Sequence, residues 1–314
     1  MRRGMYQTVW RLAFSGLAIL TGMRVLVIGG TGFIGIYIVR QLASHGHVVA
    51  VYHRGRNQTA LPESVHQIID PHSVMPIQRF PTVLFNFGPD VVIHTIAMGA
   101  ADAEASVREF SGRTGRLVLL SSGDVYRAYG RFTKIESEPI EEGLLSEDAP
   151  LRTKLFPYRA EASSHEELQY WYEKILAERA VLSDPNLPGT ILRLPKVHGP
   201  GGNEDLATIY RYRNYPDWRW THGFVENVAA AVVLAATHPF ACGRVYNVGE
   251  AYTPTIAERL TWLPPSFIEP DLNSQFDFRQ NMRFDTSRIR TELGYREIVP
   301  EEEGFLRTLR ARSG

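Results

Sequence analysis

The sequence predicts an α/β fold, a doubly wound parallel sheet with helices on both faces and a small C-terminal substrate-binding lobe. Short runs of Val, Ile and Leu recur along the chain, and helical apolar patterns separate the first of them. Near-continuous apolar runs indicate strands that are covered on both faces, as in parallel sheets. A chain of 314 residues with 44% hydrophobic residues can bury such a core.

The elements follow in order from Met23. The run VLVIGG is expected to form the first strand, residues 33–44 a helix and residues 48–52 the second strand, which together make a βαβ unit. Further strands are expected at 67–69, 90–95, 116–121, 189–193 and 244–248. Helices are expected at 102–110, 166–182 and 225–237.

A glycine-rich turn, GGTGFIG, joins the first strand to the first helix. Gly29, Gly32 and Gly35 have the spacing that allows a tight turn, a close approach of backbone to a pyrophosphate, and close packing of helix on strand. The helix that follows offers unpaired N–H groups to phosphate. The strand before and the helix after are the context that this motif requires. The sequence therefore predicts a Rossmann-type domain that binds a nicotinamide dinucleotide.

The end of the second strand bears on the choice of cofactor. NAD enzymes place an acid there for the ribose 2′-hydroxyl, and NADP enzymes place an arginine near the 2′-phosphate. This sequence has His53, Arg54 and Arg56 and no carboxylate. We therefore expect NADP, with NAD as the alternative if the arginines are only solvated surface. Asp70, after the third strand, either accepts a hydrogen bond from the adenine amino group or caps the next turn.

The chain is expected to divide into three parts. Residues 1–22 form an N-terminal extension whose apolar stretch is too short to span a bilayer, and Met23 is the expected true start. Residues 23–194 form the dinucleotide-binding domain, with a polar excursion at 127–164 beside the active site. Residues 195–314 mainly form the substrate-binding lobe. Helix 225–237 is expected in this lobe, while strand 244–248 and an adjoining helix return to the Rossmann sheet.

Charge and cysteine content exclude some classes of partner. The 34 Lys and Arg residues balance the 34 Asp and Glu residues, so no global field attracts nucleic acid or an anionic membrane, and we expect neither as a partner. The single cysteine, Cys242, excludes an internal disulfide and a multi-cysteine metal site. It also fits a reducing compartment, so we expect a cytoplasmic protein without a metal.

Two later segments carry candidate catalytic residues. LLSSGDVY places Ser122 at the carboxyl end of a strand, where ligands bind in such sheets. YWYEK places Tyr170 and Lys174 four residues apart, on one face of the expected helix. A nearby ammonium favours the phenolate of a tyrosine and so suits acid-base chemistry. Tyr172 competes as the phenol but lacks the four-residue step to Lys174.

With LRLPKVHGPGG, FVENVAAAVVLA, VYNVG and DTSRIRTELGY, these segments resemble the extended short-chain dehydrogenase/reductase family, the NAD(P)-dependent epimerase/dehydratases. The resemblance runs from Met23 to about Tyr295. It implies that Tyr170 is the catalytic acid/base, that Lys174 holds the nicotinamide ribose, and that Ser122 hydrogen-bonds the reacting oxygen. The expected cofactor contacts are Gly29, Thr31, Gly32, Phe33, Ile34, Gly35, His53, Arg54, Asp70, Ile96, Ala97, Tyr170, Lys174, Pro195 and Val197.

Several positions depart from the family pattern and bear on the substrate. Similar 4,6-dehydratases carry an Asp-Glu pair directly after the catalytic Ser or Thr, where this chain has Gly123 and Asp124, which argues against a dehydratase. Lys196 replaces an amide and either meets an anionic substrate group or is a solvated lysine at the loop rim. His198 either serves as a second acid or fills a packing role, which we favour. The expected substrate contacts are Asp124, Tyr126, Lys196 and His198.

The leading hypothesis is an NAD(P)-dependent epimerase or oxidoreductase that acts on a carbinol or carbonyl carbon. The resemblance alone implies a nucleotide sugar as its small-molecule substrate, and a reductase of a small carbonyl compound is the alternative enzyme. A non-catalytic NADP-binding sensor or RNA-binding relative is the second class, against which Ser122, Tyr170 and Lys174 argue. The short helix at 102–110 leaves the family's usual homodimer contact open. The long excursion at 127–164 is expected to form a lid or a substrate edge.

Overall fold

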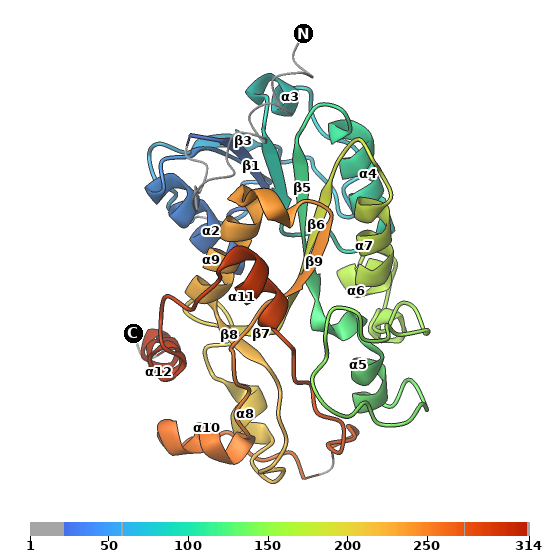
Figure 1. Cartoon of the computed structure of the whole chain (residues 1–314), viewed down its shortest axis with the longest axis vertical. Helices are drawn as coiled ribbons and strands as arrows, with labels where there is room; N and C mark the ends of the chain where they lie inside the picture. The colour runs from blue at the N-terminus through green and yellow to red at the C-terminus, as the bar shows by residue number, and fades with distance from the viewer. Residues whose placement is uncertain (1–21, 58, 273, 313–314) are drawn as a thin grey trace.

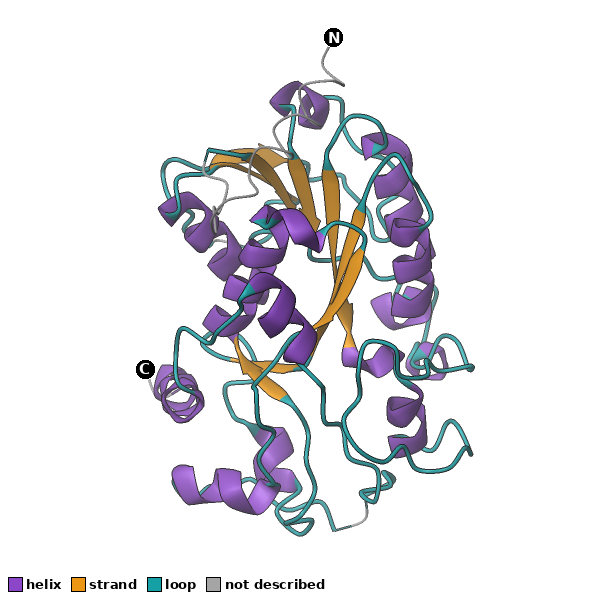
Figure 2. Cartoon of the chain, viewed as in Figure 1, coloured by secondary structure: helices purple, strands orange, loops and turns teal. Residues whose placement is uncertain are grey.

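The computed structural model describes residues 22–57, 59–272 and 274–312, and it contains the predicted parallel sheet between two layers of helices (Figures 1 and 2). Apart from Gly22, the N-terminal extension expected at 1–22 lies outside the described residues. The sheet occupies the upper part of Figure 1. Shorter elements and long loops make up the lower part.

The main sheet has seven strands, and all of their pairings are parallel. In spatial order the strands are β3 (His66–Ile69), β2 (Val48–His53), β1 (Arg24–Ile28), β4 (Val91–His94), β5 (Arg116–Ser122), β6 (Gly189–Leu194) and β9 (Arg244–Asn247). The predicted strands are thus confirmed, with small differences at their ends. The strand order reverses between β1 and β4, and this switch point opens a crevice at the carboxyl ends of the strands, where such sheets bind ligands.

Alternate residues of the strands, apart from the mostly exposed β3, supply two separate cores. In β1, Val25 and Val27 face one core, and Leu26 and Ile28 face the other. The first core is covered by α2 (Phe33–Ser44), α9 (Val225–Thr237) and α11 (Ser287–Leu293). The second is covered by α4 (Ala100–Phe110) and α7 (Lys174–Leu182). Figure 1 shows the two helical layers on opposite sides of the sheet.

Two expectations about helices are wrong. The single helix expected at 166–182 is two helices, α6 (Leu168–Trp171) and α7, separated by Tyr172 and Glu173. The carboxylate of buried Glu173 accepts hydrogen bonds from Ile175 N (3.0 Å) and Arg152 Nη2 (3.3 Å), so Glu173 caps a new helix. Helix α9 was expected in the C-terminal lobe. It packs instead against α2 on the sheet, because it is apolar on nearly all sides.

The lower part of the molecule is built from short elements around an aromatic core. These elements are α5 (Arg127–Phe132), α8 (Ala207–Arg211), α10 (Ile256–Trp262), α12 (Glu301–Arg312), the strands β7 (Lys196–His198) and β8 (His222–Phe224), and the 3-10 turns η1 (Gly123–Val125) and η2 (Arg159–Glu161). Two others belong to the sheet region: α3 (Val83–Phe87), at the top of Figure 1, and the 3-10 turn η3 (Pro239–Ala241), which follows α9. Phe132 stacks on Trp218 at 4.9 Å and on Phe276 at 4.6 Å. Because Phe132 belongs to the 127–164 excursion, this stacking joins the excursion to the lobe.

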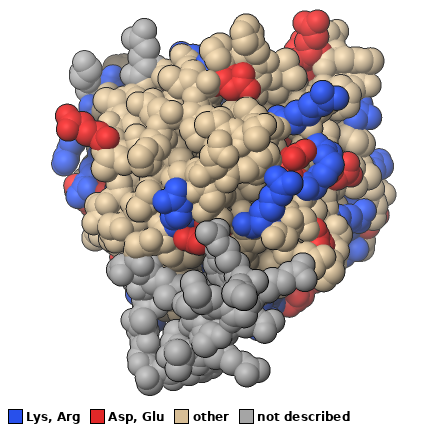
Figure 3. Space-filling model, turned by 90° about the horizontal axis from the view of Figure 1, so that it is seen from above, with Lys and Arg blue, Asp and Glu red and all other residues tan. Residues whose placement is uncertain are grey.

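The surface carries both signs of charge. On the face seen in Figure 3, Lys and Arg side chains are interspersed with Asp and Glu, in keeping with the balanced composition. Among the described residues, no helix combines the length and the apolar character that crossing a bilayer requires.

Arg116 provides a test of how the sheet is joined to its helical layer. Its guanidinium is fully buried and donates to the carbonyl oxygens of Ala235 (2.6 Å) and His238 (2.8 Å) at the end of α9. Arg116→Met leaves these acceptors unpaired, so we expect the free energy of unfolding to fall by about 3 kcal/mol in urea denaturation. Arg113→Met, at an exposed neighbour, should change it by less than about 0.5 kcal/mol. Equal effects of the two substitutions would contradict this account.

Candidate active site

Two cavities lie along the crevice at the carboxyl ends of the strands. One is bounded by the glycine turn after β1 and by the residues that follow β2. The other is bounded by Ser122 at the end of β5 and by Pro195 and Lys196 after β6. A dinucleotide that lies across the switch point of a doubly wound sheet passes along this edge.

The glycine turn has the shape that a pyrophosphate requires. Gly29 has φ +87°, and a Cβ at this position would lie 2.5 Å from Thr95 Oγ1. A Cβ on Gly35 would collide with the carbonyl oxygen of Gly29, so α2 packs directly on the turn. At Gly32, by contrast, the nearest atom to an added Cβ is 3.7 Å away, and no side chain caps the helix behind it. This open space before a free helix N-terminus fits a phosphate group.

The cavity beside the turn has a volume of about 110 Å³ and is lined by basic side chains from the end of β2. Arg54 and Arg56 both line it, and no described carboxylate pairs with either. Burial and the neighbouring Arg56 lower the pKa of Arg54. Asp70 does not line this cavity. It accepts hydrogen bonds from Tyr52 Oη (2.9 Å) and His72 N (3.2 Å), which matches the turn-capping alternative.

The remaining expected cofactor contacts are divided between the two cavities and the core. Thr31, His53 and Ile96 line the cavity beside the turn. Pro195 lines the Ser122 cavity, whereas Val197 is buried in β7. Phe33 and Ile34, at the start of α2, pack against the first core.

Lys174 is buried and does not line the second cavity, but its ammonium lies near Tyr172, which does. Nζ donates to the carbonyl oxygen of Leu120 (3.0 Å) in β5 and to that of Ala97, after β4. The ammonium lies 5.6 Å from the centre of the Tyr172 ring. Burial lowers the pKa of Lys174 to about 8, although the negative charges of Asp124 and Asp102 oppose the shift.

Asp124 accepts hydrogen bonds from two tyrosine side chains at the cavity wall. Its Oδ2 accepts hydrogen bonds from Tyr172 Oη (2.8 Å) and Tyr158 Oη (2.9 Å), and Tyr129 Oη lies 3.0 Å from Tyr158 Oη. Its Oδ1 is buried without a hydrogen-bond partner in the described structure. Burial raises the pKa of Asp124, and this effect outweighs the hydrogen bonds from the phenols. Burial, followed by the charge of Asp124, raises the pKa of Tyr172 well above 10.

The structure does not bring Tyr170 into this cavity. Its ring stacks on His165 with a centroid distance of 4.1 Å, and the guanidinium of Arg159 lies 4.6 Å from its centre. The break between α6 and α7 removes the shared helix face that Tyr170 and Lys174 were expected to occupy. Tyr172 lines the cavity instead, close enough to the Ser122 hydroxyl to interact with it.

Of the other expected substrate residues, Lys196 lines the cavity, whereas Tyr126 and His198 do not. Lys196 lines the cavity with Nζ 5.8 Å from the centre of the Trp220 ring, and burial lowers its pKa. Tyr126 lies away from the cavity and donates from its buried Oη to Asn247 Oδ1 (2.6 Å). His198 is buried and stacks on Phe305 at 4.1 Å, an arrangement that suits the packing role.

Sequence reasoning missed several residues of this cavity, which has a volume of about 370 Å³. Tyr158 and Tyr129 come from the 127–164 excursion, and Trp220 and Met282 come from the lobe. No motif distinguishes these side chains. The only signal was the position of the excursion, which was expected beside the active site.

The sequence was compared with known proteins. The model of the NAD dependent epimerase/dehydratase family matches residues 25–249. Sterol-4-alpha-carboxylate 3-dehydrogenase, decarboxylating, from Bos taurus is 26% identical over 238 residues, which are 68% of this chain and 60% of that protein. The 2'-dehydrokanamycin reductase of Streptomyces kanamyceticus is 34% identical over 104 residues, 32% of this chain and 28% of that protein. The chain therefore matches less than two thirds of the length of either curated relative.

Solved structures share the fold. Pal from Bacillus thuringiensis superposes with a TM-score of 0.66 at 19% identity, over 93% of this chain and 99% of that one. MoeE5, solved in complex with UDP-glucose and NAD, superposes with a TM-score of 0.62 at 20% identity, over 92% and 98% of the two chains. The family match extends from β1 to the residues just after β9. The chain belongs to the NAD dependent epimerase/dehydratase family, a group of NAD(P)-dependent oxidoreductases and epimerases.

Proposed function

We propose that this protein is an NAD(P)-dependent oxidoreductase or epimerase that acts on a carbinol or carbonyl carbon held in the Ser122 cavity. One observation carries the proposal: Ser122, Tyr172 and Asp124 line a single cavity, and the buried ammonium of Lys174 lies 5.6 Å from the centre of the Tyr172 ring. A hydroxyl, a phenol and a nearby cation are the groups that proton transfer at a carbinol oxygen requires.

Each of these groups has a proposed role. The dinucleotide, when bound, supplies the hydride chemistry. Tyr172 Oη gives a proton to the substrate oxygen in reduction or takes it in oxidation, and Ser122 Oγ hydrogen-bonds the same oxygen. The ammonium of Lys174 stabilises the phenolate that forms when Tyr172 gives up its proton. Tyr172 thus takes the acid/base role that the four-residue spacing to Lys174 had assigned to Tyr170. Tyr170 becomes the second candidate for this role, because it could reach Lys174 only if α6 and α7 joined into one helix.

The carboxylate content of the cavity supports plain oxidation, reduction or epimerisation over 4,6-elimination. Elimination needs one proton delivered and another removed at neighbouring carbons. Asp124 is the only carboxyl group among the described residues that line the cavity. Epimerisation would then proceed through a keto intermediate that turns and is reduced on its other face.

A nucleotide sugar is the proposed substrate class. A cavity of about 370 Å³ with a lysine beside an indole ring suits a sugar that carries an anionic group. MoeE5, which has the same fold, was solved with UDP-glucose. A reductase of a small carbonyl compound is the alternative, and the Streptomyces relative, named as a reductase, favours it.

A non-catalytic NADP-binding sensor is a second candidate function. The position of Tyr170 outside the cavity favours it, because the expected acid/base tyrosine is then not available for catalysis. The phenol of Tyr172 beside Ser122 favours the enzyme.

Substitution of the two tyrosines separates these proposals. Tyr172→Phe removes the acid/base oxygen, so we expect turnover to fall by about 10²- to 10⁴-fold while NADPH binding, measured by fluorescence, is retained. Tyr170→Phe is the matched control and should leave turnover within about twofold of wild type. Loss of turnover only in Tyr170→Phe would assign the role to Tyr170. Wild-type protein that binds NADPH but turns over no nucleotide sugar or simple carbonyl would favour the sensor.

Arg54 tests the preference for NADP. Arg54→Ser removes a charge-assisted partner of the 2′-phosphate, so we expect the Kd of NADPH to rise about 10- to 100-fold and that of NADH to change little. Arg40→Ser, at an exposed position on α2 outside the cavity, serves as the control. Tighter binding of NADH than NADPH by the wild type would overturn the proposal.

The pKa of Lys174 predicts the alkaline limit of activity. Lys174 is a cation below its pKa of about 8 and neutral above it, so stabilisation of the phenolate is lost as the pH rises. We therefore expect kcat/KM for carbonyl reduction to decline above about pH 8. Lys196→Met should keep this decline, because Lys196 lies on the cavity wall and not beneath Tyr172. A profile that stays level to about pH 9.5 would contradict the role of Lys174.

A further inference from the structure

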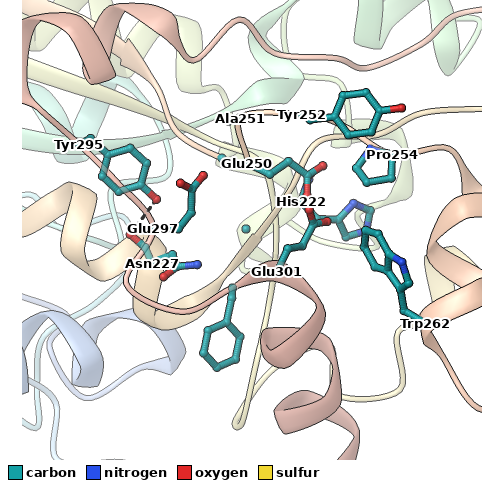
Figure 4. Close-up of a pocket in the computed structure, with 13 residues that line it drawn as sticks. His222, Asn227, Glu250, Ala251, Tyr252, Pro254, Trp262, Tyr295, Glu297 and Glu301 are labelled. Atoms are coloured by element: carbon teal, nitrogen blue, oxygen red, sulfur yellow. Dashed lines mark hydrogen bonds between the residues drawn. The ribbon is translucent and has the colours of Figure 1, made fainter.

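A third cavity, distinct from the two along the crevice, lies between β8, the loop after β9, α10 and the start of α12 (Figure 4). Its volume is about 270 Å³, and it shares no lining residue with the Ser122 cavity. Tyr252, Pro254 and Trp262 form one wall, and Tyr295 lies across from them. The proposed reaction uses none of these side chains.

Two carboxylates in this cavity share one cation. Arg259 is fully buried, and its Nη1 and Nη2 donate to Glu301 Oε1 and Glu250 Oε1 respectively. The third carboxylate, Glu297, is paired separately with Arg290 (2.9 Å). When all of these groups are ionised, the three carboxylates face two guanidinium groups, and one negative charge is left over.

The excess charge is centred on Glu250. Only 6% of this residue is exposed, and its Oε2 has no hydrogen-bond donor in the described structure. Burial raises the pKa of Glu250 well above its usual value, and the adjacent Glu301 adds to the shift. This direction favours uptake of a proton by Glu250, which would neutralise the excess charge.

His222 contributes a second acceptor without a partner. Its Nδ1 lies 2.6 Å from the carbonyl oxygen of Trp220, and a carbonyl only accepts, so the ring proton is on Nδ1. Its Nε2 therefore carries a lone pair, and this atom is buried without a partner in the described residues although His222 lines the cavity. Burial lowers the pKa of His222, and the charge of Arg259 acts in the same direction, so the ring is neutral.

We propose that this cavity binds a small organic amine, with its ammonium against Glu250 and Glu301 and its apolar body against the aromatic wall. When Glu250 is ionised, its unpartnered Oε2 and the Nε2 of His222 are both acceptors, so they suit a ligand that donates hydrogen bonds. An ammonium supplies three donors and the missing positive charge, and the indole of Trp262 in the cavity wall is an aromatic group that attracts cations. The amine displaces the proton of Glu250, and this proton passes to solvent.

Benzylamine is a suitable probe, and benzyl alcohol is its neutral counterpart. Titration calorimetry on the full chain should show saturable binding of benzylamine with release of up to one proton, detected as a dependence of the heat on the buffer's ionisation enthalpy. Benzyl alcohol should bind at least about tenfold more weakly, because it lacks the charge. Absence of saturable benzylamine binding, or equal binding of the alcohol, would overturn the proposal.

Two substitutions locate the site. Glu250→Gln mimics the protonated acid and should raise the Kd of benzylamine at least about tenfold and abolish the proton release. Glu301→Gln, at a more exposed position, should also weaken binding and covers the case in which Glu250→Gln fails to fold. Glu302→Gln, exposed on the same helix and outside the cavity, should leave the Kd unchanged. Unaltered binding in both folded cavity variants, or equal loss in Glu302→Gln, would refute the assignment.

Discussion

The buried ammonium of Lys174 fixes the geometry on which the reacting end of the crevice depends. It donates to carbonyl oxygens at the end of β5 and after β4, so the first residue of α7 is tied to two strands of the sheet. Burial of a cation is costly, and here the carbonyl acceptors and the charges of Asp124, Asp102 and Glu178 offset the cost. The ring of Tyr172 and the carboxyl of Asp124 are positioned around this fixed point.

The adjacent residue, Glu173, determines which tyrosine enters the cavity. Its buried carboxylate pairs with Arg152 and accepts a hydrogen bond from Phe156 N (2.5 Å), both from the 127–164 excursion. The same carboxylate caps α7, so α6 ends before Glu173 and α7 begins after it. One side chain therefore anchors the excursion, interrupts the helix, and sets Tyr172 facing the cavity and Tyr170 outside it.

Buried arginines elsewhere show why the third cavity is unusual. Arg193 pairs with Glu178 through two hydrogen bonds of 3.0 and 2.8 Å, and Arg152 pairs with Glu173. Each of these guanidinium groups faces one carboxylate, so charge balances locally. Arg259 faces two, Glu250 and Glu301, and the imbalance lies in a cavity rather than in packed core. A buried charge that is not fully paired must be protonated or must meet a ligand.

The sequence by itself determined the strands, the glycine turn and the two helices at 33–44 and 225–237, because apolar periodicity and glycine spacing are local signals. It also predicted Ser122, Asp124 and Lys196, which the structure brings to one cavity because they end or follow neighbouring strands, and Lys174, which begins α7. Only the tertiary structure decided that the helix is interrupted at Glu173 and that Tyr172, rather than Tyr170, lines the cavity. It also decided that Tyr158 and Trp220 line the same cavity. Those outcomes depend on contacts between residues that are not neighbours in the sequence, such as the ion pair of Arg152 with Glu173. The local pattern of apolar residues does not predict contacts of that kind.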